Sequence, residues 1–541
     1  MIKTFEKYPL ATIVIIFILM LLIQLEVPNV TIMEARNFIT AREMVLNDHW
    51  LLTTLNGEPR YHKPPLPTWI TAISGMLFGL NNLFALRLPA ALMVLFISVS
   101  MYYFSLKLTL SKKQSFLNSL ILMTSFYIVA ITNEAPVDIF THGFILAGLY
   151  FLFMLFKEKH NSWKNAIVAG IFIGFSILSK GPVSLYAVFL PFLIAFGIVF
   201  KYQNFNKKIL QFILLIILFL IIGSWWFIYV RMMDPEIFLR IASVETTNWS
   251  MYNVKPFYYY WSFFTQSGLW TIPAFISLIY PYVIKKVTHK KVYKFSFWWT
   301  ISAVILLSII PEKKARYLVP VLIPLAINIG FYIQYLIANF SKLTTKKETY
   351  PVYFNFGLIA FVGILFPVAV YIFLKNAISS HLTSYVLTSI ALVLIGSFIL
   401  RNLYVKNMNN VFYLTIAFMV ATLSLGLPMS KSLNKNIDFT TINTIHELEK
   451  EHGIKTYSIG NLAPEIIWIY KGVIKNIYKN DEIDIPETKQ FGLLMLNDEV
   501  GMVNHLLKKH YTLKLLKTYN FNVGSKNKER LIRQFYLVSK K

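Results

Sequence analysis

The sequence lacks cysteine and is poor in charge. Because the sequence contains no cysteine, a disulfide, an Fe–S cluster and a thiolate metal site are ruled out. Only 14% of the 541 residues are charged and 56% are apolar, whereas about a quarter of the residues of a soluble domain are charged. These shortages exclude a secreted disulfide scaffold and an ordinary cytosolic enzyme.

The apolar residues are concentrated in long runs. A helix needs about 20 apolar residues to cross the hydrocarbon core of a membrane, and runs of this length recur along most of the chain. We expect about thirteen spans, near 8–28, 86–106, 115–132, 139–156, 165–180, 183–200, 209–230, 263–284, 295–311, 317–339, 352–374, 383–400 and 411–429. The first run lacks a small-residue cleavage site, so we interpret it as a signal anchor.

The positive charges indicate the orientation of these spans. Alternate short loops carry 21 lysines and arginines against three acids. By the positive-inside rule this face is cytoplasmic, and the N-terminus lies on it. An odd number of spans would then place the C-terminus outside. The formal net charge of +26 is therefore a topology signal, and we expect no nucleic-acid partner.

The outer face carries the longer connections. We expect an all-α polytopic domain over residues 1–430, with large outer loops at 29–85 and 231–262. From residue 431 to 541 the composition is that of a soluble domain, in which strand-like and helical segments alternate. We predict a small extracytoplasmic α/β domain there.

The first outer loop holds ionisable residues near the membrane. Glu34 and Arg36 suit either an amphipathic helix on the membrane surface or a functional site. Farther on, His62 and Lys63 precede three prolines in four residues, which fix an extended backbone. That segment is either a proline-rich turn or a rigid support for a cation at the lipid interface.

Further ionisable residues lie at the outer ends of later spans. Asp138 is a candidate helix cap or a buried functional carboxylate, and Lys180 is a snorkelling lysine or a site residue. Residues 311–320 concentrate cations, Arg316 among them, on the outer face against the positive-inside rule. Such a cluster requires an anion, either a lipid headgroup or a bound phosphate.

Helix packing can bring these distant segments together on one face of the membrane. Transfer from a lipid-phosphate donor needs cations that hold the phosphate as it leaves and a carboxylate that orients or deprotonates the acceptor. The pattern favours this chemistry.

The first loop also resembles a known family. The matching motifs are Glu34-x-Arg36, Arg42-Glu43-Met44, Leu55-Asn56-Gly57, Tyr61-His62-Lys63-Pro64-Pro65, Trp69, Phe78-Gly79 and Arg87-Leu88-Pro89. The likeness continues at Asp138, Ser179-Lys180-Gly181-Pro182, Trp225-Trp226 and Arg316-Tyr317-Leu318-Val319-Pro320. The chain is similar to the bacterial aminoarabinose transferases that modify lipid A, and to the wider group related to protein O-mannosyltransferases. These are GT-C glycosyltransferases, so the resemblance implies a GT-C fold.

The resemblance also implies roles for individual residues. Met33 stands at the family's acidic position, so either Glu34 or Asp138 would be the catalytic carboxylate. The donor's phosphate would be bound by Lys63, Lys180, Arg316, Tyr317 and Arg36. His62 occupies the position of a family metal ligand, which makes a divalent ion such as zinc a candidate cofactor. Glu245 and Trp249 would belong to the acceptor loop, unless the aromatic run there is only an interfacial anchor.

The function we expect is that of an inverting glycosyltransferase of the bacterial inner membrane. It would move a sugar, aminoarabinose-like by resemblance, from undecaprenyl phosphate to an extracytoplasmic acceptor such as lipid A or another glycolipid. One alternative is a protein O-glycosyltransferase, whose acceptor is a protein. A second is a transporter or flippase of lipid-linked sugars, which predicts charges near the midplane and broken spans in corresponding halves. A third is an inactive binding or scaffold protein.

Overall fold

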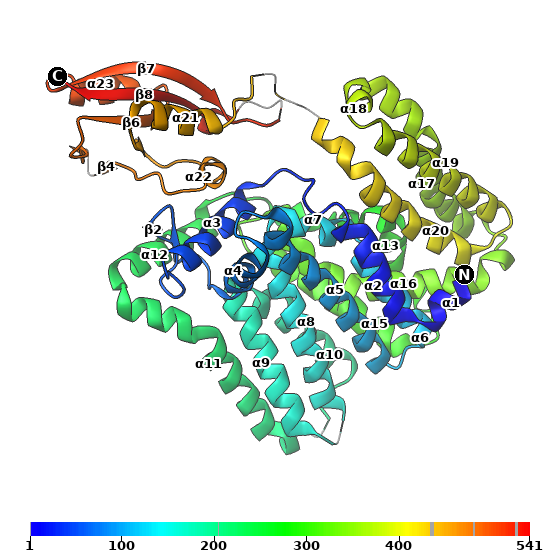
Figure 1. The fold of residues 1–541 in the computed structure, drawn as a ribbon. Helices are drawn as coiled ribbons and strands as arrows, with labels where there is room; N and C mark the ends of the chain where they lie inside the picture. The colour runs from blue at the N-terminus through cyan, green and yellow to red at the C-terminus, as the bar shows by residue number, and fades with distance from the viewer. Residues whose placement is uncertain are drawn as a thin grey trace.

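The computed structural model describes residues 2–158, 160–203, 205–432, 436, 438–479, 482–524 and 528–541. Long helices dominate up to Ser432, and the larger sheet lies beyond it (Figure 1). The long apolar helices are α5 (Leu83–Lys107), α8 (Pro136–Lys157), α9 (Ser162–Lys180), α11 (Ile209–Met233), α15 (Lys290–Ile309), α16 (Leu322–Asn339), α17 (Lys346–Phe373), α19 (Leu382–Tyr404) and α20 (Met408–Ala421).

Among the described residues, nine helical segments are long and apolar enough to cross a membrane. A tenth is the pair α6 (Lys112–Met123) and α7 (Phe126–Glu134), which is bent by 43°. The predicted class, a polytopic helical domain followed by a small domain with strands, is confirmed. The expected thirteen spans are not reached by this criterion.

Three expected spans account for the difference. The runs at 8–28 and 183–200 form shorter apolar helices, Pro9–Leu22 and Leu185–Val199. The run at 263–284 is broken into η5 (Phe263–Trp270), α13 (Thr271–Ser277) and α14 (Tyr280–Val283). Gly268 adopts a φ of 66°, which a helix does not allow, and Pro281 at the start of α14 has no backbone N–H to continue one.

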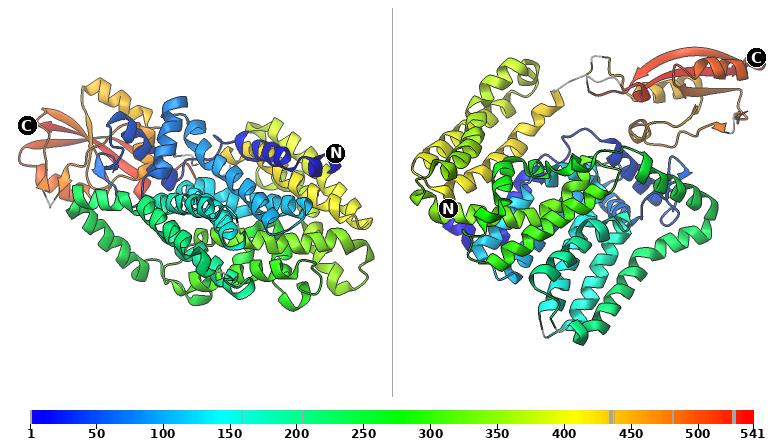
Figure 2. Two further views of the ribbon diagram at one scale, coloured as in Figure 1. Left: turned by 90° about the horizontal axis from the view of Figure 1, so that it is seen from below. Right: turned by 180° about the vertical axis from the view of Figure 1, so that it is seen from behind.

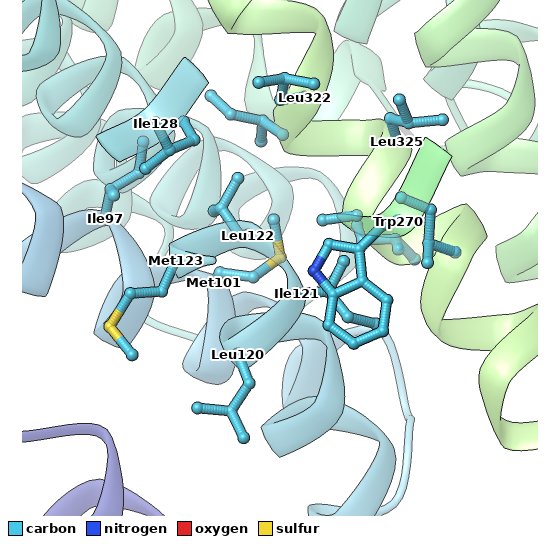
Figure 3. Close-up of a cluster of buried hydrophobic side chains, with 14 of the residues drawn as sticks. Ile97, Met101, Leu120, Ile121, Leu122, Met123, Ile128, Trp270, Leu322 and Leu325 are labelled. Carbon is cyan, nitrogen blue, oxygen red and sulfur yellow. The ribbon is translucent and has the colours of Figure 1, made fainter. Parts of the chain in front are cut away.

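The main apolar core lies between the central helices. Figure 3 shows Trp270 against side chains of α6 and α16, including Ile121, Leu322 and Leu325. The Trp270 indole is fully buried, and its N–H donates to Oγ1 of Thr124 at 2.9 Å. This polar partner satisfies the one donor that the ring brings into the core.

The first outer loop folds into α3 (Ile32–Leu46), a short hairpin of β1 (Thr54–Leu55) and β2 (Glu58–Pro59), and α4 (Leu66–Phe78). Thr31 caps α3 and Glu34 completes the capping box. The buried carboxylate of Glu43 accepts backbone N–H groups from Asn56 and Gly57 at 2.7 and 3.2 Å, which fixes the hairpin turn. The loop is therefore an ordered structure that α3 supports.

The C-terminal region contains a four-stranded mixed sheet of order β3-β6-β8-β7. Strand β3 (Thr456–Ser458) runs parallel to β6 (Gln490–Met495), and β8 (Ile532–Lys540) is antiparallel to both β6 and β7 (Tyr511–Asn520). The helices are α21 (Asn443–His452), α22 (Pro464–Tyr470) and α23 (Val500–Leu507), and a second hairpin pairs β4 (Tyr478–Lys479) with β5 (Glu482–Ile483).

The C-terminal region packs directly on the first outer loop. In Figure 1, α22 lies over α3, while α8 to α11 extend in the opposite direction. Phe38 of α3 and Trp468 of α22 belong to one apolar cluster, with ring centroids 5.3 Å apart. Asn56 accepts from the Ile474 N–H at 2.8 Å and donates to the Ile474 carbonyl at 2.7 Å. Figure 2 shows this assembly at the end of the molecule away from the N-terminus.

Candidate functional site

A cavity of about 1070 Å³ lies where the first outer loop, α12 (Pro235–Met251), the loop at 311–317 and the C-terminal region meet. Lys63, Lys180 and Arg316 all line it. These residues are far apart in the sequence, and each comes from a different outer connection or helix end. The predicted convergence of cations therefore occurs in one cavity.

Asp138 lies behind two of these cations. Its Oδ2 accepts from Lys180 Nζ at 2.6 Å, and its Oδ1 is 3.9 Å from Lys63 Nζ. The Asp138 side chain is 1% exposed, whereas Lys63 keeps 26% of its side chain accessible. Asp138 stands in the first turn of α8, and Lys180 is the last residue of α9 before Gly181, whose φ of 89° ends the helix. Asp138 thus positions the two ammonium groups, and the lysines face the cavity.

Tyr317 forms an aromatic surface among three cations. Its ring centroid is 5.1 Å from Lys180 Nζ, 5.4 Å from Lys314 Nζ and 5.8 Å from the Arg316 guanidinium carbon. The electron-rich face of an aromatic ring attracts cations, so Tyr317 reduces the repulsion among them. Its hydroxyl donates to Glu312, which also pairs with Lys314.

Burial and neighbouring cations disfavour the charged forms of Lys63 and Arg60 at the hairpin side of the cavity. Burial, together with Lys180 and Arg316, lowers the pKa of Lys63 from 10.5 to about 8, although Asp138 opposes this. Burial and the charge of Arg36 lower the pKa of Arg60 to about 10. Neither Arg36 nor Arg316 forms an ion pair within the described part of the chain. The guanidinium groups of Arg36 and Arg316 are therefore available to bind an anion.

The predicted metal ligand does not fit a metal ion. His62 lines the cavity, and burial together with Arg60, Arg36 and Lys63 lowers its pKa to about 4. Three neighbouring cations oppose a divalent ion. Among the described residues no group of three or more His, Cys, Asp or Glu side chains could hold a metal. His62 is instead an exposed side chain in the cavity wall, and its lowered pKa favours the neutral form.

Glu34 lies outside the cavity, which corrects its predicted catalytic role. Its side chain is 0% exposed, and both carboxylate oxygens accept from Arg87, at 2.7 and 3.1 Å. One oxygen also accepts the backbone N–H of Thr31 at 2.9 Å. A carboxylate occupied in this way is inaccessible to a substrate, and it serves to attach α3 to α5.

Glu245 and Trp249 belong to α12. Every residue of this helix is at least partly exposed. Both line the cavity. The other two lining carboxylates are paired, Glu58 with Lys479 and Glu312 with Lys314. Within the described residues Glu245 forms no ion pair, so it is the carboxylate that remains available in this cavity.

Sequence reasoning did not select several residues that line the cavity. Arg60 and Arg240 come from the two outer loops, and Asn461, Asn476 and Lys479 come from the C-terminal region. Arg60 carried a signal, since it directly precedes the Tyr61-His62-Lys63 segment. The three C-terminal residues carried none, because only the packing of α22 on α3 brings them to the cavity.

The charges in the cavity are unbalanced. Eight lysines and arginines and three glutamates line it: Arg36, Arg60, Lys63, Lys180, Arg240, Lys314, Arg316 and Lys479, with Glu58, Glu245 and Glu312. Including Asp138 behind the wall, an excess of four positive charges remains. Such an excess within a confined space attracts anions.

Comparison with known proteins identifies the fold. A family model described as dolichyl-phosphate-mannose-protein mannosyltransferase matches residues 62–227. An undecaprenyl phosphate-alpha-4-amino-4-deoxy-L-arabinose arabinosyl transferase of Wigglesworthia glossinidia brevipalpis is 31% identical over 310 residues, 56% of this chain and 54% of that protein. The protein of that name in Photorhabdus laumondii is 24% identical over 81% of this chain and 79% of its own length. The chain spans about half the length of the curated relatives that it matches at 30% identity or more.

Two solved structures share the fold of this protein over 99% of the chain. The crystal structure of ArnT from Cupriavidus metallidurans in the apo state has a TM-score of 0.67 at 16% identity and covers 99% of this chain and 98% of that one. The same protein bound to undecaprenyl phosphate has a TM-score of 0.66 at 17% identity, with the same coverage. The chain therefore has a GT-C fold like that of ArnT, and it is a multi-pass membrane protein that resembles the aminoarabinose transferases.

Proposed function

We propose that this GT-C chain is a glycosyltransferase that moves a sugar from a polyprenyl phosphate to an acceptor at the outer face of a bacterial inner membrane. The observation that carries the proposal is the convergence of Lys63, Lys180 and Arg316 on one cavity. The printed names of its relatives, and the undecaprenyl phosphate bound to its structural neighbour, support a donor of this class.

The cations would act on the phosphate that leaves. In an inverting transfer the acceptor oxygen forms a bond to the anomeric carbon while the bond from that carbon to the phosphate oxygen breaks. Negative charge then grows on the polyprenyl phosphate. Preorganised cations at this position stabilise the transition state more than the ground state. Lys63, Lys180 and Arg316 serve this purpose, and Asp138 is a positioning residue for both lysines.

The charge excess favours an anionic acceptor. A phosphodiester donor carries one negative charge, whereas the cavity has an excess of four positive charges. A phosphate on a glycolipid, as on lipid A, would use the remaining cations, and it needs no strong base because its oxygen is already ionised. Glu245, the carboxylate of the cavity that forms no ion pair among the described residues, would be available to the amine or hydroxyl groups of such a ligand. A serine or threonine of a protein acceptor would leave the excess uncompensated.

The transfer is tested in nanodiscs that contain the full chain, undecaprenyl phosphate-aminoarabinose and lipid A. We expect free undecaprenyl phosphate and a mass increment on lipid A. Replacing Lys63, Lys180 or Arg316 singly by Ala should lower the rate about 10²–10³-fold, the loss that follows removal of one oxyanion donor. Lys509→Ala, an exposed lysine of the C-terminal region, is the matched control and should retain the activity.

Three results would contradict the proposal. In proteoliposomes, movement of the donor across the bilayer without release of undecaprenyl phosphate would indicate a flippase. Equal losses in the three variants and in Lys509→Ala would remove the assigned role of the cavity cations. Transfer to a peptide in preference to lipid A would overturn the anionic acceptor.

A further inference from the structure

We propose that the protein binds an anionic diacyl phospholipid in a second cavity, at the lysine-rich face that the charge pattern predicts to be cytoplasmic. This cavity has a volume of about 640 Å³ and lies between α13, α14 and the start of α17. That volume falls within the range of about 300–1,000 Å³ typical of small-molecule sites. The site is separate from the sugar-transfer cavity and does not depend on the proposed function.

The cavity exists because one span is broken. The run at 263–284 forms three short helices in place of one, and the turn after α13 leaves Ile279 between it and α14. Ile272, Phe275 and Phe354 make the walls apolar. Phe275 is 49% exposed and Phe354 is 63% exposed, so the mouth opens on the surface that faces lipid. An acyl chain suits such a surface better than water does, since water would find few polar partners there.

The polar rim of the cavity carries positive charge. Glu348, its one lining carboxylate, is fully engaged. It accepts from the Tyr282 hydroxyl at 2.8 Å and from Thr345 at 2.9 Å, and it pairs with Lys286 at 3.1 Å. The charge of Glu348 is thus already compensated by Lys286.

Lys347 lines the cavity and Lys346 is adjacent, and within the described residues neither forms an ion pair. Both are exposed at the start of α17. Basic pockets between helices at a cytoplasmic surface favour anionic headgroups. A phospholipid with a net negative charge, such as phosphatidylglycerol, can place its phosphate against these lysines and one acyl chain along the apolar walls. A zwitterionic lipid fits the walls but leaves the charge of the rim uncompensated.

The experiment counts bound lipids by native mass spectrometry of the full chain in detergent. The probes are phosphatidylglycerol, phosphatidylcholine of the same acyl chains, and undecaprenyl phosphate. We expect phosphatidylglycerol to bind at least tenfold more tightly than phosphatidylcholine and to raise the melting temperature. The double substitution Lys346→Ala and Lys347→Ala should remove this preference. Lys342→Ala, an exposed lysine of the same loop that does not line the cavity, should preserve it.

A second variant tests the apolar part. Ile279→Trp fills the hollow from its 42% exposed position and should displace bound phosphatidylglycerol while Lys346 and Lys347 are intact. The proposal is overturned if phosphatidylglycerol and phosphatidylcholine bind equally, or if Lys342→Ala weakens binding as much as the double variant. It is also overturned if undecaprenyl phosphate displaces phosphatidylglycerol from the cavity.

Discussion

Lys63 is the cavity cation whose charge depends on pH in a measurable range. Burial and the neighbouring cations lower its pKa to about 8, so the free protein loses this positive charge as the pH rises through that value. A bound phosphate stabilises the ammonium form and raises the pKa again. The loss of the Lys63 charge should therefore weaken the binding of the donor to the free enzyme, which kcat/KM reports.

The first prediction is a falling limb near pH 8 in the profile of kcat/KM for the donor, because above it Lys63 is neutral and attracts the phosphate less. In the profile of kcat the limb should move to higher pH. Lys63→Arg keeps its charge throughout and should abolish the limb at pH 8. Donor turnover measured from pH 6 to 10 checks this, and an unchanged limb in Lys63→Arg would assign it to another group.

Glu34 and Arg87 form a buried ion pair that the sequence does not reveal. Arg87 is 2% exposed, and its third donor binds the Leu25 carbonyl at 2.9 Å. The pair joins the start of α3 to α5 and so fixes the base of the first outer loop. Removing one partner leaves an uncompensated buried charge, which typically costs about 3–5 kcal/mol.

The second prediction follows from this geometry. Glu34→Ala should lower the melting temperature strongly in detergent, by the equivalent of about 3–5 kcal/mol, because Arg87 is left unpaired. The double variant with Arg87→Met should recover much of this loss, since no buried charge remains. A Glu34→Ala protein that keeps its stability but loses all transfer activity would restore the catalytic interpretation.

At the scale of elements, the hairpin of β1 and β2 connects the membrane helices to the C-terminal region. On the side of the membrane helices, the Glu43 carboxylate accepts the backbone N–H groups of Asn56 and Gly57 in the turn. On the side of the C-terminal region, the Asn56 side chain makes two hydrogen bonds to the backbone of Ile474. Arg60 and Lys63 follow this hairpin directly, so its position determines where these cations stand in the cavity.

The third prediction concerns this connection. Asn56→Ala leaves the N–H and carbonyl of Ile474 without their partners, at a cost of about 1–3 kcal/mol for each buried group. We expect faster proteolysis of the C-terminal region and a higher KM for donor and acceptor. The exposed Asn47 at the end of α3 provides the matched control, and Asn47→Ala should behave as the unchanged protein. Identical proteolysis of both variants would show that the contact does not hold the C-terminal region.

These elements show how far the sequence alone could predict the fold and the site. Most span positions follow from hydropathy, because hydropathy depends on local patterns. The break at Gly268 depends on a single left-handed residue within an apolar run, which hydropathy does not register. Lys63, Lys180 and Arg316 could be selected because each is a cation on the wrong face. The buried ion pair of Arg87, by contrast, could not be predicted, because its partner lies on another helix and no local pattern connects the two.

At the scale of the whole molecule, the lysine pattern determines which compartment each of the two cavities faces. The loops that this pattern makes cytoplasmic include residues 340–345, and the C-terminal region is then extracytoplasmic. Both cavities need this arrangement. The proposed transfer requires the first cavity to face the outer compartment that holds the acceptor, and the proposed lipid site requires the lysines of α17 to meet the anionic inner leaflet.

The absence of cysteine makes this topology directly testable. Because the sequence contains no cysteine, a single introduced cysteine is the only thiol of the variant. We expect Lys509→Cys in the C-terminal region to react with a membrane-impermeant maleimide in intact spheroplasts, and Thr344→Cys between α16 and α17 to react only after the membrane is permeabilised. Both positions are exposed, so a difference in labelling reports the side of the membrane and not burial. Labelling of Thr344→Cys in intact spheroplasts would invert the topology. It would then place the eight cavity cations on the side from which an outer acceptor cannot reach them.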